Sequence, residues 1–121
     1  MADHNELGKE GEEVALRYLQ SKSYAILETN WRGNAGELDI IARHRDQIAF
    51  IEVKTRSGIP FTDAERSITR QKQKKMVKLA HSYLLRSGIT GEARFDILII
   101  LKKGEGEYDI RLIEDAFYPL L

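Results

Sequence analysis

The 121-residue sequence contains no cysteine. Disulfide bonds and zinc sites built on thiolates are therefore excluded, and nothing in the composition indicates an oxidising compartment. No apolar run is long enough to span a bilayer, and the opening stretch MADHNELGK is too polar for the hydrophobic core of a secretory signal. We therefore expect a soluble, cytoplasmic protein that has no membrane partner.

The sequence also lacks a net charge, because 19 Lys and Arg residues balance 19 Asp and Glu residues. Such a balance gives no global indication of nucleic-acid binding. The distribution is uneven, since the stretch from Ala64 to Gly88 holds seven basic residues and one acid, a local charge of +6. A solvated helix face is the usual explanation of such a run, and the run alone favours it. The functional alternative is a surface that faces phosphate beside an acidic site.

Repeats, low-complexity segments and Pro/Ser-rich linkers are absent too, which predicts a single domain over residues 1–121. Apolar residues recur at helical spacing from Glu6 to Ser21 and from about Asp63 to Arg86. β-rich runs predict five strands, at Ser23–Asn30, Glu37–Ala42, Ile48–Thr55, Phe95–Leu101 and Glu107–Ile113. The order αβββαββ indicates an α/β fold with a mixed β-sheet flanked by helices. The long helix between two strands predicts a right-handed parallel crossover.

Ionic residues interrupt two of these apolar strands. Asp39 lies within GELDIIA, and Glu52 and Lys54 lie within FIEVKTR. Ionised side chains are almost never fully buried unless they are paired or bound to a metal. Because side chains alternate along a strand, Glu52 and Lys54 share a face.

A hairpin between these two strands would bring their charges together. If the turn is centred between Arg45 and Asp46, paired residue numbers sum to 91, so that Asp39 faces Glu52. The same register places Glu37 opposite Lys54. Two carboxylates this close repel each other unless a cation lies between them or one is protonated.

Hard divalent cations fit such a pair of acids, because Mg²⁺ is typically held by one or two carboxylates and a substrate phosphate. Lys54 can reach the same bound oxygen, which suits phosphodiester hydrolysis. The structural alternative is an ion cluster on an exposed sheet face, where ion pairs contribute little to folding stability. If a helix covers that face, such a cluster would cost stability, because unmatched charge would be desolvated.

Other ionic residues are less decisive. Glu12 lies within about 20–40° of the apolar stripe of the first predicted helix, at 100° per residue. A further acid for the site and an N-terminal acid that complements the helix dipole are equally good explanations. Asp96 is expected to pair with Arg94 or to cap a turn. The three histidines, His4, His44 and His81, lack the spacing of metal ligands.

Taken together, several motifs carry a resemblance that extends over nearly the whole chain. They are GKEGEEVA, NWRGNAGELDIIA, FIEVKTR, ITRQKQKKM, AHSYL and RFDILII, which begin at Gly8, Asn30, Phe50, Ile68, Ala80 and Arg94. The sequence resembles the YraN family of bacterial proteins, which has a restriction-endonuclease-like fold and is similar to the PD-(D/E)xK nucleases, including archaeal Holliday-junction resolvases. Leu38 stands where that superfamily has the proline of its motif.

The resemblance implies roles for individual residues. Asp39 and Glu52 would be ligands of Mg²⁺ or Mn²⁺, together with the Val53 carbonyl, and Glu12 would serve an outer shell or a second ion. Lys54 would position water or stabilise the transition state. Candidate contacts to nucleic acid are Arg32, Arg56 and Lys72, although solvation is the simpler role for Lys72.

Three functional hypotheses follow. The first is a Mg²⁺-dependent nuclease, endonuclease or exonuclease, that hydrolyses phosphodiester bonds in DNA, with branched or damaged DNA in repair or recombination as the expected substrate. Cleavage of two strands would favour a homodimer. The second is a non-catalytic nucleic-acid-binding module that retains the nuclease fold. The third is a metal-stabilised interaction protein without a nucleic-acid role.

Overall fold

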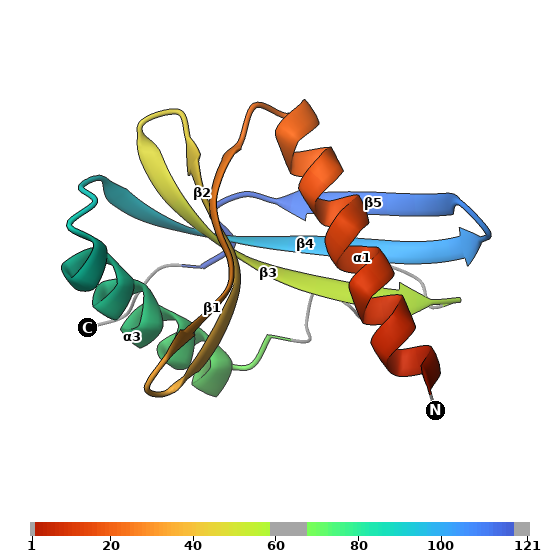
Figure 1. The fold of residues 1–121 in the computed structure, drawn as a ribbon, viewed down its shortest axis with the longest axis horizontal. Helices are drawn as coiled ribbons and strands as arrows, with labels where there is room; N and C mark the ends of the chain where they lie inside the picture. The colour runs from red at the N-terminus through yellow and green to blue at the C-terminus, as the bar shows by residue number, and fades with distance from the viewer. Residues whose placement is uncertain (1, 59–67, 118–121) are drawn as a thin grey trace.

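A mixed five-stranded sheet organises the computed structural model, which describes residues 2–58 and 68–117 (Figure 1). The elements, in chain order, are α1 (Ala2–Ser21), β1 (Ala25–Gly33), β2 (Gly36–His44), β3 (Gln47–Ser57), α3 (Arg70–Ser87), β4 (Glu92–Gly104) and β5 (Glu107–Ile113). The predicted α/β class and the order αβββαββ are confirmed. Within the described part of the chain, no helix has the length and apolarity needed to cross a membrane.

The strands lie in the sheet in the order in which they occur along the chain, from β1 at one edge to β5 at the other. All neighbouring strands are antiparallel except β3 and β4, which are parallel and connected through α3. The predicted parallel crossover is therefore found. It places the charged strand β3 at the centre of the sheet, where helices can cover both of its faces.

The two helices pack on opposite faces of the sheet. On one face, Ala15 and Leu19 of α1 join a core with Ile51 of β3 and Ile100 of β4. On the other face, the buried side of α3 packs against Phe50 and against the twisted ribbon formed by β1 and β2 (Figure 1). Strand β4 is buried from residue 94 to residue 100, which explains its nearly continuous apolar sequence.

Helix α3 begins later than predicted. The predicted helix started near Asp63, and residues 63–67 lie outside the described part of the chain, but Ile68 and Thr69 are not helical. Thr69 is the N-cap, and its side chain accepts a hydrogen bond from the backbone N–H of Lys72. The helix ends at Ser87 and is capped by Gly88, whose left-handed conformation (φ 74°) suits glycine. The N-cap therefore defines the first turn of α3, which carries Lys72.

The β2–β3 hairpin has the predicted register, with pairs from His44↔Gln47 to Ile40↔Ile51 that all sum to 91. Backbone pairing ends at Ile40 and Ile51, so the expected direct pairing of Asp39 with Glu52 does not continue the ladder. Glu37 likewise has a different partner, because it lies opposite Arg32 on β1 and pairs with that guanidinium at 3.5 Å. Strand β2 therefore separates from β3 at Asp39, and the separation creates room for a site.

Candidate functional site

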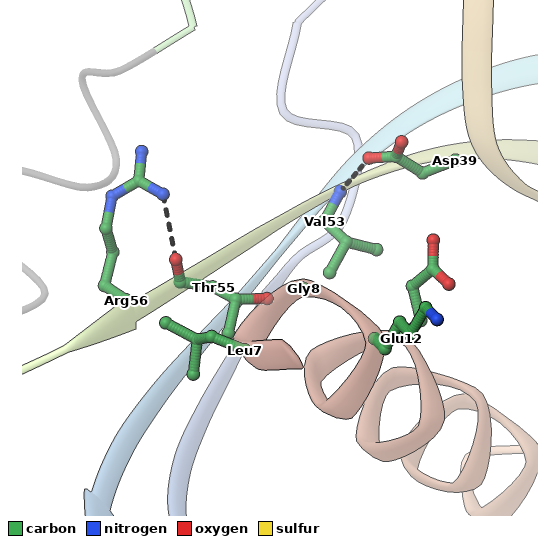
Figure 2. Close-up of a pocket in the computed structure, with 8 residues that line it drawn as sticks. Leu7, Gly8, Glu12, Asp39, Val53, Thr55 and Arg56 are labelled. Atoms are coloured by element: carbon green, nitrogen blue, oxygen red, sulfur yellow. Dashed lines mark hydrogen bonds between the residues drawn. The ribbon is translucent and has the colours of Figure 1, made fainter. Parts of the chain in front are cut away.

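Asp39 lies where strands β2 and β3 separate. Its Oδ2 accepts a hydrogen bond of 2.8 Å from the backbone N–H of Val53, so that a side chain takes over where the β-ladder ends (Figure 2). Burial and the nearby charge of Glu52 raise the pKa of Asp39 from an ordinary 3.8 to about 6, against the opposing effects of the Val53 N–H and Lys72. The charge of Glu52 thus affects the pKa of the partly buried Asp39, as expected for two carboxylates on neighbouring strands.

Glu52 is the most buried acid of the site, with 8% of its side chain exposed. Two ammonium groups neutralise it: Nζ of Lys72 lies 3.1 Å and Nζ of Lys54 lies 3.6 Å from its Oε2. Lys54 shares the face of β3 with Glu52, whereas Lys72 comes from the first turn of α3. The alternative of an ion cluster on an exposed sheet face is therefore not what forms, because Glu52 is buried and α3 brings a second cation to it.

A pocket of ≈ 520 Å³ lies on the α1 side of the same place. Its lining consists of Leu7, Gly8, Lys9, Glu12, Asp39, Val53, Thr55 and Arg56. Figure 2 shows Glu12 on α1 and Asp39 on β2 reaching the pocket from different elements, with Val53 of β3 beside them. Glu12, whose role the sequence left open, thus belongs to the same pocket as Asp39.

Close contact between α1 and β3 brings Glu12 to this pocket. Gly11 is buried against Thr55, and a Cβ built at Gly11 would come 2.1 Å from Thr55 Oγ1. Only glycine permits this approach without displacement of the neighbouring residue. Sequence reasoning did not identify Gly11 or Thr55, since their contact joins segments that are distant in the sequence.

The remaining predicted residues divide between the pocket and its surroundings. Arg56 lines the pocket, and its guanidinium donates a hydrogen bond of 2.9 Å to the Thr55 carbonyl oxygen (Figure 2). Arg32 lies on the exposed β1–β2 hairpin, where it pairs with Glu37, outside the pocket lining. Lys72 was expected to be solvated, but it contacts Glu52 directly. Its role in the site could not be derived from the strands alone.

The donor set fits a hard divalent cation held by few protein ligands. Asp39 and Glu52 offer carboxylate oxygens from adjoining strands, and their repulsion, visible in the raised pKa of Asp39, would be relieved by a cation between them. Within residues 2–58 and 68–117, no group of three or more His, Asp or Glu side chains gathers to enclose an ion. Mg²⁺ suits this arrangement, since it keeps several waters and often uses only one or two carboxylates.

The five-stranded mixed sheet between two helices, with paired acids and lysines beside its central strand, is consistent with a restriction-endonuclease-like core. The model of the "Uncharacterised protein family UPF0102" matches residues 11–100. The chain belongs to this family, UPF0102, which is the YraN family that the motifs indicated.

Curated relatives match over nearly their full length. The UPF0102 protein FP2501 of Flavobacterium psychrophilum is 42% identical over 118 residues, which cover 98% of each chain. UPF0102 proteins of Phocaeicola vulgatus and Bacteroides thetaiotaomicron are each 40% identical, over 119 and 121 residues. The match to the Phocaeicola vulgatus protein covers 98% of both chains. The match to the Bacteroides thetaiotaomicron protein covers 100% of this chain and 99% of that relative. The names of these relatives state the family and no activity.

Proposed function

We propose that this protein is a Mg²⁺-dependent nuclease that hydrolyses phosphodiester bonds in DNA, with Mn²⁺ able to replace Mg²⁺. The observation that carries the proposal is the coupling of two acids with two lysines where β2 separates from β3. Glu52 helps to raise the pKa of Asp39 to about 6, and Lys54 and Lys72 both contact Glu52. Such a combination of carboxylates and ammonium groups suits a cation and a phosphate bound side by side.

Each residue of the candidate site has a part in the proposed reaction. Asp39 and Glu52 would hold the cation, together with the Val53 carbonyl, and Glu12 would act from its outer shell. A bound Mg²⁺ would polarise the phosphoryl group and make its water a better nucleophile. Lys54 orients that water or stabilises the negative charge that develops on the phosphate. The Val53 N–H keeps the Asp39 carboxylate in place through the hydrogen bond at 2.8 Å.

Branched or damaged DNA in repair or recombination is the proposed substrate, and the cytoplasm is the proposed place of action. Arg56 at the pocket and Arg32 on the β1–β2 hairpin supply further positive charge for phosphate contacts. Lys72 has an exposed fraction of 42%, which leaves its ammonium free to turn from Glu52 to a phosphate. Cleavage of two strands of a branched substrate would favour a homodimer.

A cleavage assay tests the proposal. The purified protein is incubated with single-stranded, duplex and four-way-branched DNA in Mg²⁺, in Mn²⁺ and in EDTA. We expect metal-dependent cleavage that is reduced at least about 100-fold in Glu52→Gln and in Lys54→Met, in line with the loss of a group that acts on the transition state. Glu13→Gln is the matched control, because Glu13 is exposed on α1 and pairs only weakly with Arg17 at 4.0 Å. Cleavage that survives both site substitutions comes from a contaminant and refutes the proposal.

A second candidate is a nucleic-acid-binding module that does not cleave. It is favoured by one observation: Glu52 is already neutralised by two lysines, as in an ion cluster that binds phosphate through its cations. Binding that weakens steeply with salt, without cleavage in either metal, would identify this function. If neither binding nor cleavage is found, an interaction protein without a nucleic-acid role remains.

A further inference from the structure

Helix α3 presents a row of basic side chains on the side that faces away from the sheet. Met76, Leu79 and Tyr83 bury one side of the helix, and the opposite side carries exposed residues at intervals of three or four. These exposed residues are Arg70, Lys74, Lys78, His81 and Leu85. At 1.5 Å per residue, successive lysines of the row lie about 6 Å apart along the helix axis.

Among residues 2–58 and 68–117, no acid pairs with the cations of this row. Helix α3 contains no Asp or Glu, and in the described part of the chain Lys72 is the only residue of the helix that forms an ion pair with an acid. Arg70, Lys74 and Lys78 are like charges at i and i+4, an arrangement that destabilises a helix. A basic first turn also opposes the helix dipole, and α3 has no acid in its first turn.

Many cations elsewhere in the described part of the chain have partners. Ion pairs with acids occupy Arg17, Arg32, Arg45, Lys54, Arg94, Lys102 and Lys103. Lys22 lies over the ring of Tyr18, and Arg56 donates a hydrogen bond to the Thr55 carbonyl oxygen. The chain has no net charge, so the concentration of cations on α3, a helix without any acid, is a local feature. A local concentration of like charges that costs helix stability indicates a polyanionic partner.

We propose that the outward row of α3 binds the sugar-phosphate backbone of duplex DNA. Proteins that bind single strands combine cations with aromatic side chains on which bases stack. The row has no Phe, Tyr or Trp: the one such residue of α3, Tyr83, is buried against Trp31 and Phe50. A straight row of cations without a stacking platform therefore suits a duplex, which exposes phosphates and hides its bases.

The row also leads to the candidate site, and this part of the inference rests on the proposed function. Lys72, in the first turn of α3, contacts Glu52, so the helix runs from the site outward along the protein. The helix has 18 residues and is about 27 Å long, which equals the length of roughly eight base pairs. A duplex bound along α3 would thus reach the first turn of the helix, where Lys72 contacts Glu52.

Anisotropy of a fluorescently labelled 20-base-pair duplex tests the inference in EDTA, where no metal-dependent cleavage occurs. The test variant is Lys74→Gln/Lys78→Gln, and the matched control is Arg17→Gln/Lys103→Gln, which removes the same charge from exposed positions elsewhere. We expect the test variant to lose about tenfold or more in affinity at low salt and to lower the slope of log K against log salt by about 2, since each phosphate contact contributes about 0.9. The control should bind like the unmodified protein.

Several results would overturn the inference. They are unchanged binding by the test variant, an equal loss in the control variant, tighter binding of a single strand than of the duplex, or preferential binding to vesicles of phosphatidylserine and phosphatidylcholine. Thermal unfolding confirms that both variants fold.

The same experiments separate this inference from the nuclease proposal. Duplex binding through α3 without cleavage supports DNA binding by the outward row of α3 and refutes the proposed nuclease function. Cleavage of DNA, together with unchanged duplex binding by Lys74→Gln/Lys78→Gln, supports the proposed nuclease function and refutes DNA binding by the row. Glu13→Gln should keep the salt slope of the unmodified protein, because Glu13 is exposed on α1 and is not part of the row.

Discussion

Replacing Gly11 by alanine introduces a methyl group where helix α1 meets strand β3. The new Cβ would lie 2.1 Å from Thr55 Oγ1, 2.9 Å from its Cγ2 and 3.0 Å from its Cβ. Rotation of the threonine side chain cannot relieve all three contacts, because the Cβ does not move with χ1. Helix α1 must therefore shift away from β3, and Glu12, the next residue, must shift with it.

The expected change in stability is the difference between two effects. Overpacking of a close contact costs about 1–3 kcal/mol. Alanine is favoured over glycine within a helix by about 0.8–1.0 kcal/mol, which offsets part of that loss. We therefore expect Gly11→Ala to lower the free energy of unfolding by up to about 2 kcal/mol, measured by urea denaturation.

Two further variants make this prediction specific. Gly8→Ala is the matched control on the same helix, because nothing lies within 4 Å of its added Cβ, and it should stabilise the protein through helix propensity. Gly11→Ala/Thr55→Ala removes the two shorter contacts and should recover most of the loss. If Gly11→Ala is as stable as Gly8→Ala, or if Thr55→Ala restores nothing, the close contact does not position α1 and the reasoning is wrong.

Three other predictions concern charged groups. In EDTA the raised pKa of Asp39, about 6, means that the folded protein keeps a proton which the unfolded chain releases, so its contribution to stability falls as pH rises from about 4 to 6. Urea denaturation at several pH values gives the unfolding free energies of Asp39→Asn and of the unmodified protein. The difference between the two should change by up to about 3 kcal/mol across this pH range, at about 1.4 kcal/mol per pKa unit. A difference that does not change with pH would contradict this prediction. Lys72→Met removes a cation that lowers the pKa of Asp39, so NMR titration should find that pKa higher than in the unmodified protein; an unchanged value would place Lys72 away from the site. Burial, and then the charge of Arg94, lower the pKa of His44, so the stability that the neutral imidazole contributes is lost as pH falls below 6.5. His44→Phe keeps a ring to stack on Tyr24, and its melting temperature relative to that of the unmodified protein should be higher at pH 5 than at pH 7.5. An equal difference in melting temperature at both pH values would refute this prediction.

Local patterns were sufficient to predict most of the fold. The apolar run around Phe95–Leu101 indicated a strand covered on both faces, and β4 is buried in that way. The even-numbered hairpin turn at Arg45 and Asp46 predicted the β2–β3 register because side-chain alternation leaves few consistent pairings. Asp96 was expected to pair with Arg94, and their side chains lie 2.7 Å apart.

The parts that could not be predicted depend on contacts between distant segments. At Asp39, β2 leaves β3 but stays paired with β1, and a strand pattern does not specify where a ladder ends. Lys72 looked like one cation in a solvated row, because its sequence neighbours are also basic. The contact of Lys72 with Glu52 depends on how α3 crosses the sheet, which periodicity does not determine.

The central claim is that Asp39 and Glu52 together hold a divalent cation, and calorimetric titration with Mn²⁺ tests it most directly. Asp39→Asn is the informative variant, because its amide oxygen can still accept the hydrogen bond from Val53 while the charge is lost. We predict saturable binding by the unmodified protein and by Glu13→Gln, and at least about tenfold weaker binding by Asp39→Asn. Equal affinity of Asp39→Asn and the unmodified protein, or no binding heat in either, would contradict the account.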